Sequence, residues 1–166
     1  MDPILDKARA GQNALEQIAN AIPGFSGYRE RERRRDADRL QREYLASRLE
    51  ESKRALNDLA IAATRGGALE SINDVETARK RLDKVVNRIR YADRGYSGFF
   101  DAVKIDEATL GRVYAFDLGL LDGVDAVRTA ADAASGAGAA LGGLLAALNA
   151  LDSSLADREA ILSGVK

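Results

Sequence analysis

The residues of this sequence that are the clearest candidates for binding chemistry are basic side chains at helical spacing. Guanidinium groups form paired hydrogen bonds with phosphate oxygens, so a line of them on one helix face can contact lipid headgroups or nucleic acid. Steps of three and four residues place side chains on one such face. Two lines have this spacing: Arg31, Arg35, Arg39 and Arg42, and then Lys80, Lys84 and Arg88. Contact with an anionic partner is one interpretation of these lines.

A solvated helix face is the other interpretation, and the sequence favours it. Acidic residues alternate with the arginines throughout this stretch. Glu30 precedes Arg34 by four residues and Glu32 precedes Arg35 by three, which are spacings that let a helix pair its own charges. Such pairs weaken the field that an anion would meet.

Aromatic residues form a second candidate site, because two loops repeat one pattern. Residues 24–28 and 95–99 both read Gly, aromatic, Ser, Gly, aromatic. If the helices between them pair antiparallel, the two loops lie at the same end of the molecule and their rings gather there. We predict either a small satellite core or an exposed contact for a partner or membrane. The rings concerned are Phe25, Tyr28, Tyr96, Phe99 and Phe100.

Catalytic chemistry has little support in the composition. The chain has no His and no Cys, which excludes imidazole catalysis, thiolate nucleophiles and thiolate zinc sites. Carboxylates recur between residues 101 and 125, but a dinuclear metal site in a helical bundle also uses histidine. No glycine-rich segment is followed by the Lys-Ser/Thr of a phosphate loop. We therefore predict no catalytic residue, no metal and no cofactor.

The elements that must position these side chains are helices. Apolar residues recur at steps of three and four over residues 3–21, 28–64, 68–93, 106–134 and 139–162, which is the helical period. Asp106 is a candidate cap, and residues 94–105 have no clear period. Arg65, Gly66 and Gly67 form a hairpin turn. We predict an all-α fold, a bundle of four or five helices built from antiparallel hairpins with one long charged helix.

Length and charge bound the organisation of the chain. Its 166 residues suit a single domain over 1–166, with an N-terminal helix (2–22), a long hairpin (28–93) and an Ala/Gly/Leu-rich hairpin (106–162). The net charge is −1, yet residues 1–100 hold twenty basic and sixteen acidic side chains, whereas residues 101–166 hold five and ten. This asymmetry fits two complementary hairpins or a self-associating subunit.

The expected location is cytoplasmic, because the first residues are not those of a secretory signal. Residues 133–151 carry no charge over 19 positions, but they are mostly Ala and Gly, which favours close helix packing over a membrane span. Nineteen Arg against six Lys indicate a GC-rich bacterial genome.

The stretch 22–39 resembles the opening of uncharacterised bacterial helical proteins. The resemblance rests on Pro-Gly-Phe-Ser-Gly-Tyr at residues 23–28 and on the Arg-rich helix that follows, and it implies no known activity. In general form, the long charged hairpin is similar to phage-shock and ESCRT-type membrane-remodelling proteins. That likeness is one of shape, which does not imply function.

A non-enzymatic interaction or scaffold protein is the function that these patterns favour. We expect it to form a homo-oligomer, most simply a dimer, because the residue 28–64 helix exceeds a compact bundle and the 139–162 helix carries a heptad-like Leu stripe. An unidentified protein partner is also expected. Two alternatives stay open: anionic-surface binding, to membrane lipid or nucleic acid, through the Arg line, and a small-ligand binder or enzyme with a carboxylate or aromatic pocket.

Overall fold

The structure is a computed structural model that describes residues 2–67, 69–92, 97–137 and 141–164. Within these ranges every regular element is a helix and no strand is present, so the all-α prediction is confirmed there. The elements are α1 (Pro3–Ala21), the 3₁₀ helix η1 (Arg31–Arg33), α2 (Arg34–Glu50), α3 (Ser52–Arg65), α4 (Leu69–Arg90), α5 (Ser97–Asp101), α6 (Glu107–Ala137) and α7 (Leu141–Ser163).

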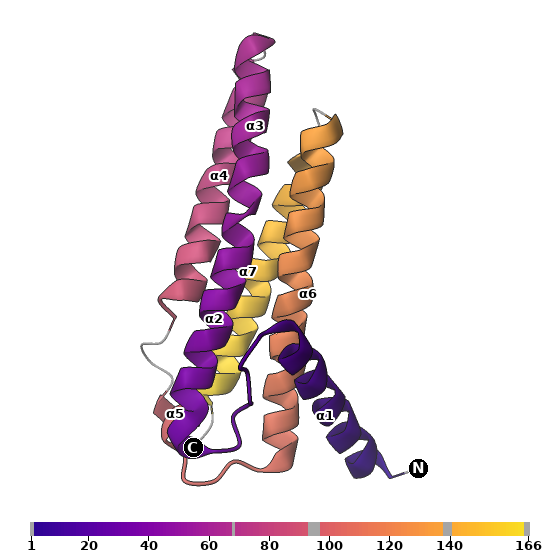
Figure 1. Ribbon diagram of the computed structural model, residues 1–166, viewed down its shortest axis with the longest axis vertical. Helices are drawn as coiled ribbons and strands as arrows, with labels where there is room; N and C mark the ends of the chain where they lie inside the picture. Colours follow the sequence, from indigo (N-terminus) through magenta and orange to yellow (C-terminus); the bar gives the residue numbers. More distant parts are fainter. Residues whose placement is uncertain (1, 68, 93–96, 138–140, 165–166) are drawn as a thin grey trace.

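The expectation of one uninterrupted helix over residues 28–64 is wrong. Residues 28–30 are a bend, Glu30 has an extended backbone (φ −85°, ψ 117°), and the α-helix begins only at Arg34 after the turn η1. Tertiary hydrogen bonds to the backbone of Tyr28 hold this bend, as described below. A second break lies at Glu51, which keeps helical angles (φ −58°, ψ −31°), so α3 continues in the general direction of α2 (Figure 1).

Helices α3 and α4 lie side by side and meet at a tight turn (Figure 1). Gly66 follows α3 directly, and Gly67 has a φ of 68°, a left-handed conformation that glycine adopts without a steric penalty. Helix α4 ends at Arg90 rather than at residue 93. It packs against α2 as well as α3 and reaches α7 on its other side.

The segment between α4 and α6 contains a helix that the sequence did not predict. The short helix α5 begins at Ser97 and buries Phe99 and Phe100, which are 0% and 3% exposed. Helix α6 then begins at Glu107, and Asp106 caps it, because the Thr109 N–H donates to Asp106 Oδ1 at 2.7 Å. The predicted cap is therefore confirmed, whereas the expected count of four or five helices is too low.

The core lies between α6 and α7 and the α2–α4 layer, and α1 crosses α6 from outside (Figure 1). Gly11 makes this crossing possible: a Cβ built on Gly11 would lie 2.6 Å from the Gly111 Cα, closer than two carbon atoms can approach. The predicted stripe of the last helix is buried in the core through Leu144, Leu148, Leu151, Leu155 and Leu162. None of the helices in the described part of the chain is both long enough and apolar enough to cross a membrane.

Candidate functional site

The most concentrated set of polar side chains is a network inside the core, centred on Arg158 of α7. Its Nε donates to Asp117 Oδ1 of α6 at 2.6 Å, and its Nη2 donates to Asp38 Oδ1 of α2 at 2.7 Å. Nη2 also lies 3.1 Å from Gln41 Oε1. These four residues are at most 4% exposed. The network therefore joins α2, α6 and α7 through a guanidinium group without access to bulk water.

Tyr28 links this network to the loop before α2. Its hydroxyl donates to Asp117 Oδ2 at 2.5 Å, and its backbone N–H donates to Tyr114 Oη at 2.8 Å. The two tyrosine rings stack with centroids 5.6 Å apart. Burial, with the nearby Asp117 carboxylate, raises the pKa of Tyr28 well above its ordinary value, so the phenol stays neutral and donates.

Two further arginines use backbone carbonyls as partners. Arg42 Nε donates to Asp38 Oδ2 at 2.7 Å, and its Nη1 donates to the Arg90 carbonyl at the end of α4 at 2.7 Å. Arg34 donates to the carbonyls of Tyr28 at 2.8 Å and Ala102 at 2.6 Å. A guanidinium at these carbonyls holds the bend before α2 and the segment after α5 in place, which explains why residues 28–30 are not helical.

The charges of Arg42 and Arg158 are balanced by Asp38 and Asp117, whereas the partners of Arg34 are backbone carbonyls. Burial opposes the charge of Arg158, but the carboxylates of Asp117 and Asp38 outweigh it and raise its pKa well above the ordinary value. With Arg158 held charged and Tyr28 held neutral, neither group exchanges a proton near neutral pH. Chemically, this arrangement is suited to fixing helices relative to one another rather than to acid–base catalysis.

The sequence contained a signal for this network that our helix analysis missed. Arg34, Asp38 and Gln41 extend the buried stripe of Leu45 and Leu49 backwards at steps of four, three, four and four. Asp117 continues the α6 stripe and Arg158 continues the α7 stripe in the same manner. A charged residue at a core position of an apolar stripe needs a buried partner. The charged residues at such positions in α2, α6 and α7 could therefore have been paired with one another.

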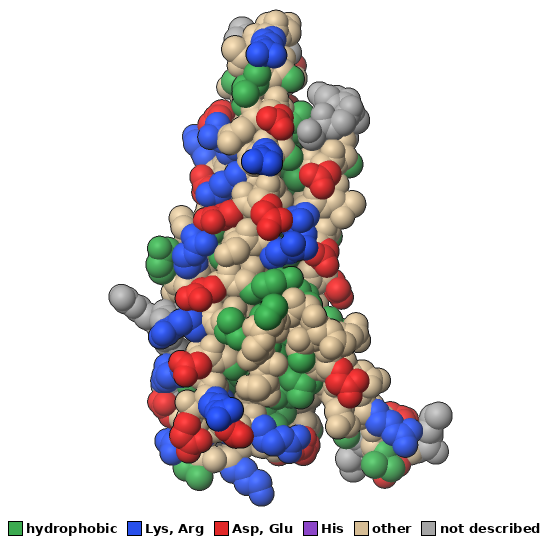
Figure 2. Space-filling model, viewed as in Figure 1, with side chains coloured by type: hydrophobic (Ala, Val, Ile, Leu, Met, Phe, Trp, Pro, Cys, Tyr) green, Lys and Arg blue, Asp and Glu red, His purple; other side chains and the backbone are tan. Residues whose placement is uncertain are grey.

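The predicted arginine line is divided by the fold. Arg42 is buried in the network, and Arg35 pairs with Asp101 at 3.1 Å while its guanidinium lies over the Phe100 ring. Arg31 and Arg39 are exposed and have no carboxylate within ion-pair distance among the described residues. Basic and acidic side chains are interspersed over the face shown in Figure 2. Anion contact through this line stays a prediction, and Arg31 and Arg39 are the residues that could make it.

The second basic line is also divided. Arg88 donates to Asp152 Oδ1 at 2.6 Å and to Glu159 Oε2 at 3.1 Å, which ties α4 to α7. Lys80 and Lys84 are exposed on α4. Only these two lysines are left as candidate anion contacts in the line.

Four of the five predicted aromatic rings form one buried cluster. Phe25 meets Tyr28 edge-on at 5.5 Å between centroids, Tyr28 meets Phe99 at 5.3 Å, and Phe99 meets Phe100 at 5.5 Å. Tyr96 lies outside the described residues. The four described rings pack in the core rather than face solvent, and the meeting of the two loops stays a prediction.

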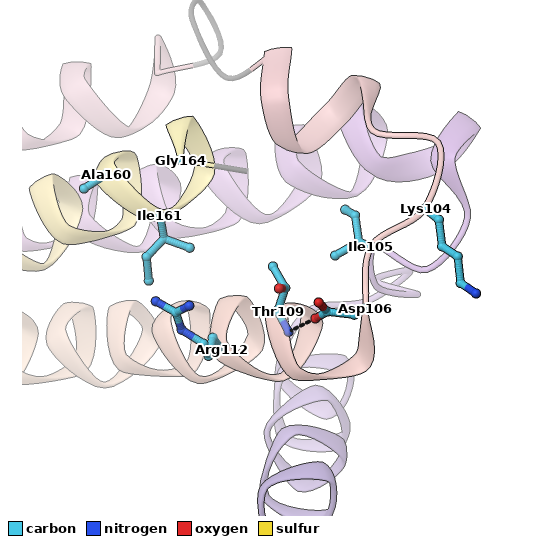
Figure 3. Close-up of a pocket in the computed structure, with 8 residues that line it drawn as sticks. All are labelled: Lys104, Ile105, Asp106, Thr109, Arg112, Ala160, Ile161 and Gly164. Carbon is cyan, nitrogen blue, oxygen red and sulfur yellow. Dashed lines mark hydrogen bonds between the residues drawn. The ribbon is translucent and has the colours of Figure 1, made fainter. Parts of the chain in front are cut away.

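A surface cavity of about 440 Å³ lies between the start of α6 and the end of α7. Figure 3 shows Thr109 and Arg112 pointing from α6 toward Ile161 of α7, and Ile105 pointing into the same space from the preceding linker. Among the described residues, no three potential metal ligands lie together. The cavity is therefore lined by the aliphatic side chains of Ile105 and Ile161 and by the polar or charged side chains of Lys104, Asp106, Thr109 and Arg112.

Comparison with protein-family models, curated proteins and solved structures found no match to this chain.

Proposed function

We propose that this protein is a non-enzymatic interaction or scaffold protein that acts through self-association and partner binding. The uncovered start of α1 is the observation that supports the proposal. Ala14 and Ile18 pack against the core, but Leu5 is 57% exposed, and Ala8 is also exposed, on the turns before the crossing with α6. The apolar stripe of this amphipathic helix continues beyond the part that packs on the core. The exposed part of the stripe is a surface on which another chain can pack.

A dimer is the assembly that we propose, because two copies of one exposed helix end can pair about a two-fold axis. Two features of the sequence predict self-association, the length of the residue 28–64 helix and the Leu stripe of the last helix. The structure divides the first into η1, α2 and α3 and buries the second within the chain. The proposal of self-association therefore rests on α1 rather than on α7. We also propose that the helices form a bundle of antiparallel hairpins, since α3 packs on α4 and α6 on α7 across short connections. The cytoplasmic location stays a prediction.

Light scattering at tens of micromolar protein tests self-association. We expect twice the mass of one chain for the native protein and the mass of a single chain for Leu5→Asp. Ala10→Asp is the matched control, because it adds the same charge to an exposed α1 position that lies about 140° around the helix from Leu5. A native protein with the mass of one chain would overturn the proposal.

Anion binding by the exposed arginines is a second candidate function. It is supported by Arg31 and Arg39, whose guanidinium groups have no carboxylate partner among the described residues. Replacing both by Gln should weaken binding to anionic vesicles or duplex DNA, and more so at low salt, where exposed charges are least screened. Equal binding by the native and doubly substituted proteins would exclude these residues.

A further inference from the structure

The cavity between α6 and α7 has the size and mixed lining of a small-ligand site. Its volume of about 440 Å³ falls within the ~300–1,000 Å³ that ligand pockets commonly have. The aliphatic side chains of Ile105 and Ile161 face it from two different segments (Figure 3). Apolar walls with a few polar groups are the usual composition of such sites.

One of the polar groups that line the cavity is the guanidinium of Arg112. Arg112 is exposed and has no hydrogen-bond acceptor or ion-pair partner among the described residues, although its positive charge contributes to lowering the pKa of Asp106. This contrasts with Arg29, Arg35 and Arg88, each of which reaches a carboxylate on another element. Guanidinium groups bind carboxylates through two parallel hydrogen bonds. Arg112, unlike the other three arginines, can therefore still bind a carboxylate in this way.

The charge around the cavity favours an anion over a cation. Lys104 and Arg112 line it, and the one carboxylate in the lining is Asp106. Asp106 already accepts the Thr109 N–H at the start of α6, and this hydrogen bond lowers its pKa. The Thr109 N–H at that helix start is therefore satisfied by the chain itself, whereas the Arg112 guanidinium has no hydrogen-bond acceptor among the described residues.

We propose that this cavity binds an aliphatic carboxylate, with the carboxylate on Arg112 and the aliphatic portion against Ile105 and Ile161. A single guanidinium beside two apolar walls complements a monoanion with a short hydrocarbon chain. The same chemistry occurs in a free short-chain acid and in the terminal carboxylate of a polypeptide that ends in an aliphatic residue. Binding here does not require self-association, so the two proposals fail separately.

Titration of the ¹⁵N-labelled full chain with hexanoate, followed by amide chemical shifts, tests the site. We expect saturable shifts confined to residues 104–112 and 160–164, and an affinity about tenfold lower for Arg112→Gln, which loses a charged hydrogen-bonding group. Arg54→Gln is the matched control, because Arg54 is an exposed arginine on α3 without an ion-pair partner among the described residues. This control should bind as the native protein does.

Two further ligands sharpen the result. Hexanol has a similar aliphatic chain but no carboxylate, so it should bind more weakly than hexanoate by a similar factor. N-acetyl-Ala-Leu with a free carboxylate, compared with its amide, tests the polypeptide source, and tighter binding of the dipeptide than of hexanoate would assign the site to a chain terminus. Equal binding of hexanoate to native protein and Arg112→Gln, or shifts outside the cavity, would overturn the proposal.

Discussion

Arg158 shows how a single residue can fix the relation of several helices. Its guanidinium meets carboxylates from α2 and α6, at 2.7 Å from Asp38 and 2.6 Å from Asp117. A buried ion pair adds little net stability compared with a well-packed apolar group, but removing one partner leaves an uncompensated charge. Such a network therefore penalises every arrangement in which these three helices are out of register.

Arg158→Met should strongly destabilise the protein. The change leaves Asp117 buried and without its cation, and a broken buried pair costs about 3–5 kcal/mol. Adding Asp117→Asn should restore part of the loss, because an amide keeps an acceptor for Tyr28 without a charge. Chemical denaturation of the single and double variants measures both effects, and a double variant less stable than Arg158→Met would contradict the account.

Alkaline titration tests the buried tyrosines. Burial raises the pKa of Tyr28, which is raised further by Asp117, and burial also raises the pKa of Tyr114. A phenol with a raised pKa in the folded state stabilises the fold fully below its unfolded pKa of about 10. That stability is lost as the pH rises above this value toward the folded pKa.

The ultraviolet absorbance of phenolate measures this directly. Native protein and Tyr28→Phe should show the same absorbance change as the pH passes about 10, because Tyr28 does not ionise in the folded protein. A smaller change in Tyr28→Phe would show that Tyr28 does titrate there. Circular dichroism at each pH verifies that both proteins are still folded.

At the scale of elements, the crossing of α1 over α6 depends on contact between two backbones. Gly11 has no side chain, and a Cβ at this position would lie only 2.6 Å from the Gly111 Cα. By contrast, a Cβ on Gly119, also in α6, would meet nothing within 4 Å. Two helical glycines therefore have opposite roles: one is required by packing, and the other only weakens its helix.

Alanine substitutions at these two glycines should change stability in opposite directions. Gly119→Ala should stabilise the protein by about 0.5–1 kcal/mol, because alanine favours a helix over glycine. Gly11→Ala gains the same propensity but forces α1 away from α6, so it should destabilise by about 1–3 kcal/mol, a typical overpacking cost. Thermal denaturation compares the two, and a Gly11→Ala protein as stable as Gly119→Ala would refute the close crossing.

Across the whole molecule, ion pairs within the chain connect the basic and the acidic parts of the sequence. Residues 1–100 are the basic part and residues 101–166 the acidic part. Arg29 pairs with Glu107 at 2.5 Å, Arg35 with Asp101 at 3.1 Å, and Arg88 with Asp152 at 2.6 Å. Arg88 is the most buried of these three arginines, with a side chain 27% exposed. These pairs join the basic part of the chain to the acidic part, as the interpretation of complementary hairpins expects.

Arg88→Gln should therefore destabilise the packing of α4 on α7. We expect a loss of about 1 kcal/mol, at the upper end for partly exposed ion pairs, and a smaller loss at high salt because screening weakens the native contact. Lys84→Gln removes the same charge from an exposed position one turn earlier and should change stability by less than about 0.5 kcal/mol. Equal effects of the two variants would show that the Arg88 pairs contribute nothing specific.

The sequence by itself determined the helical class and most helix positions, because these depend on local period and capping. The predicted first helix, residues 3–21, matches α1, and the predicted Asp106 cap is present. The apolar stripes of α6 and α7 also lie in the core. Local signals suffice here because a 3.6-residue period and a cap are properties of adjacent residues.

Only the tertiary structure decided what the charged residues do. The same helical spacing that suggested an exposed line of arginines is compatible with Arg42 pointing inward. Arg42 precedes Leu45 by three residues and Leu49 by seven. It therefore shares their buried face, whereas Arg39 does not. The bend at residues 28–30 likewise depends on Tyr114 and Arg34, which accept from and donate to Tyr28. Partners 86 residues apart in the chain come together only once the helices pack. For that reason, spacing along one helix indicates which charged residues lie on a buried face but not which partners they meet.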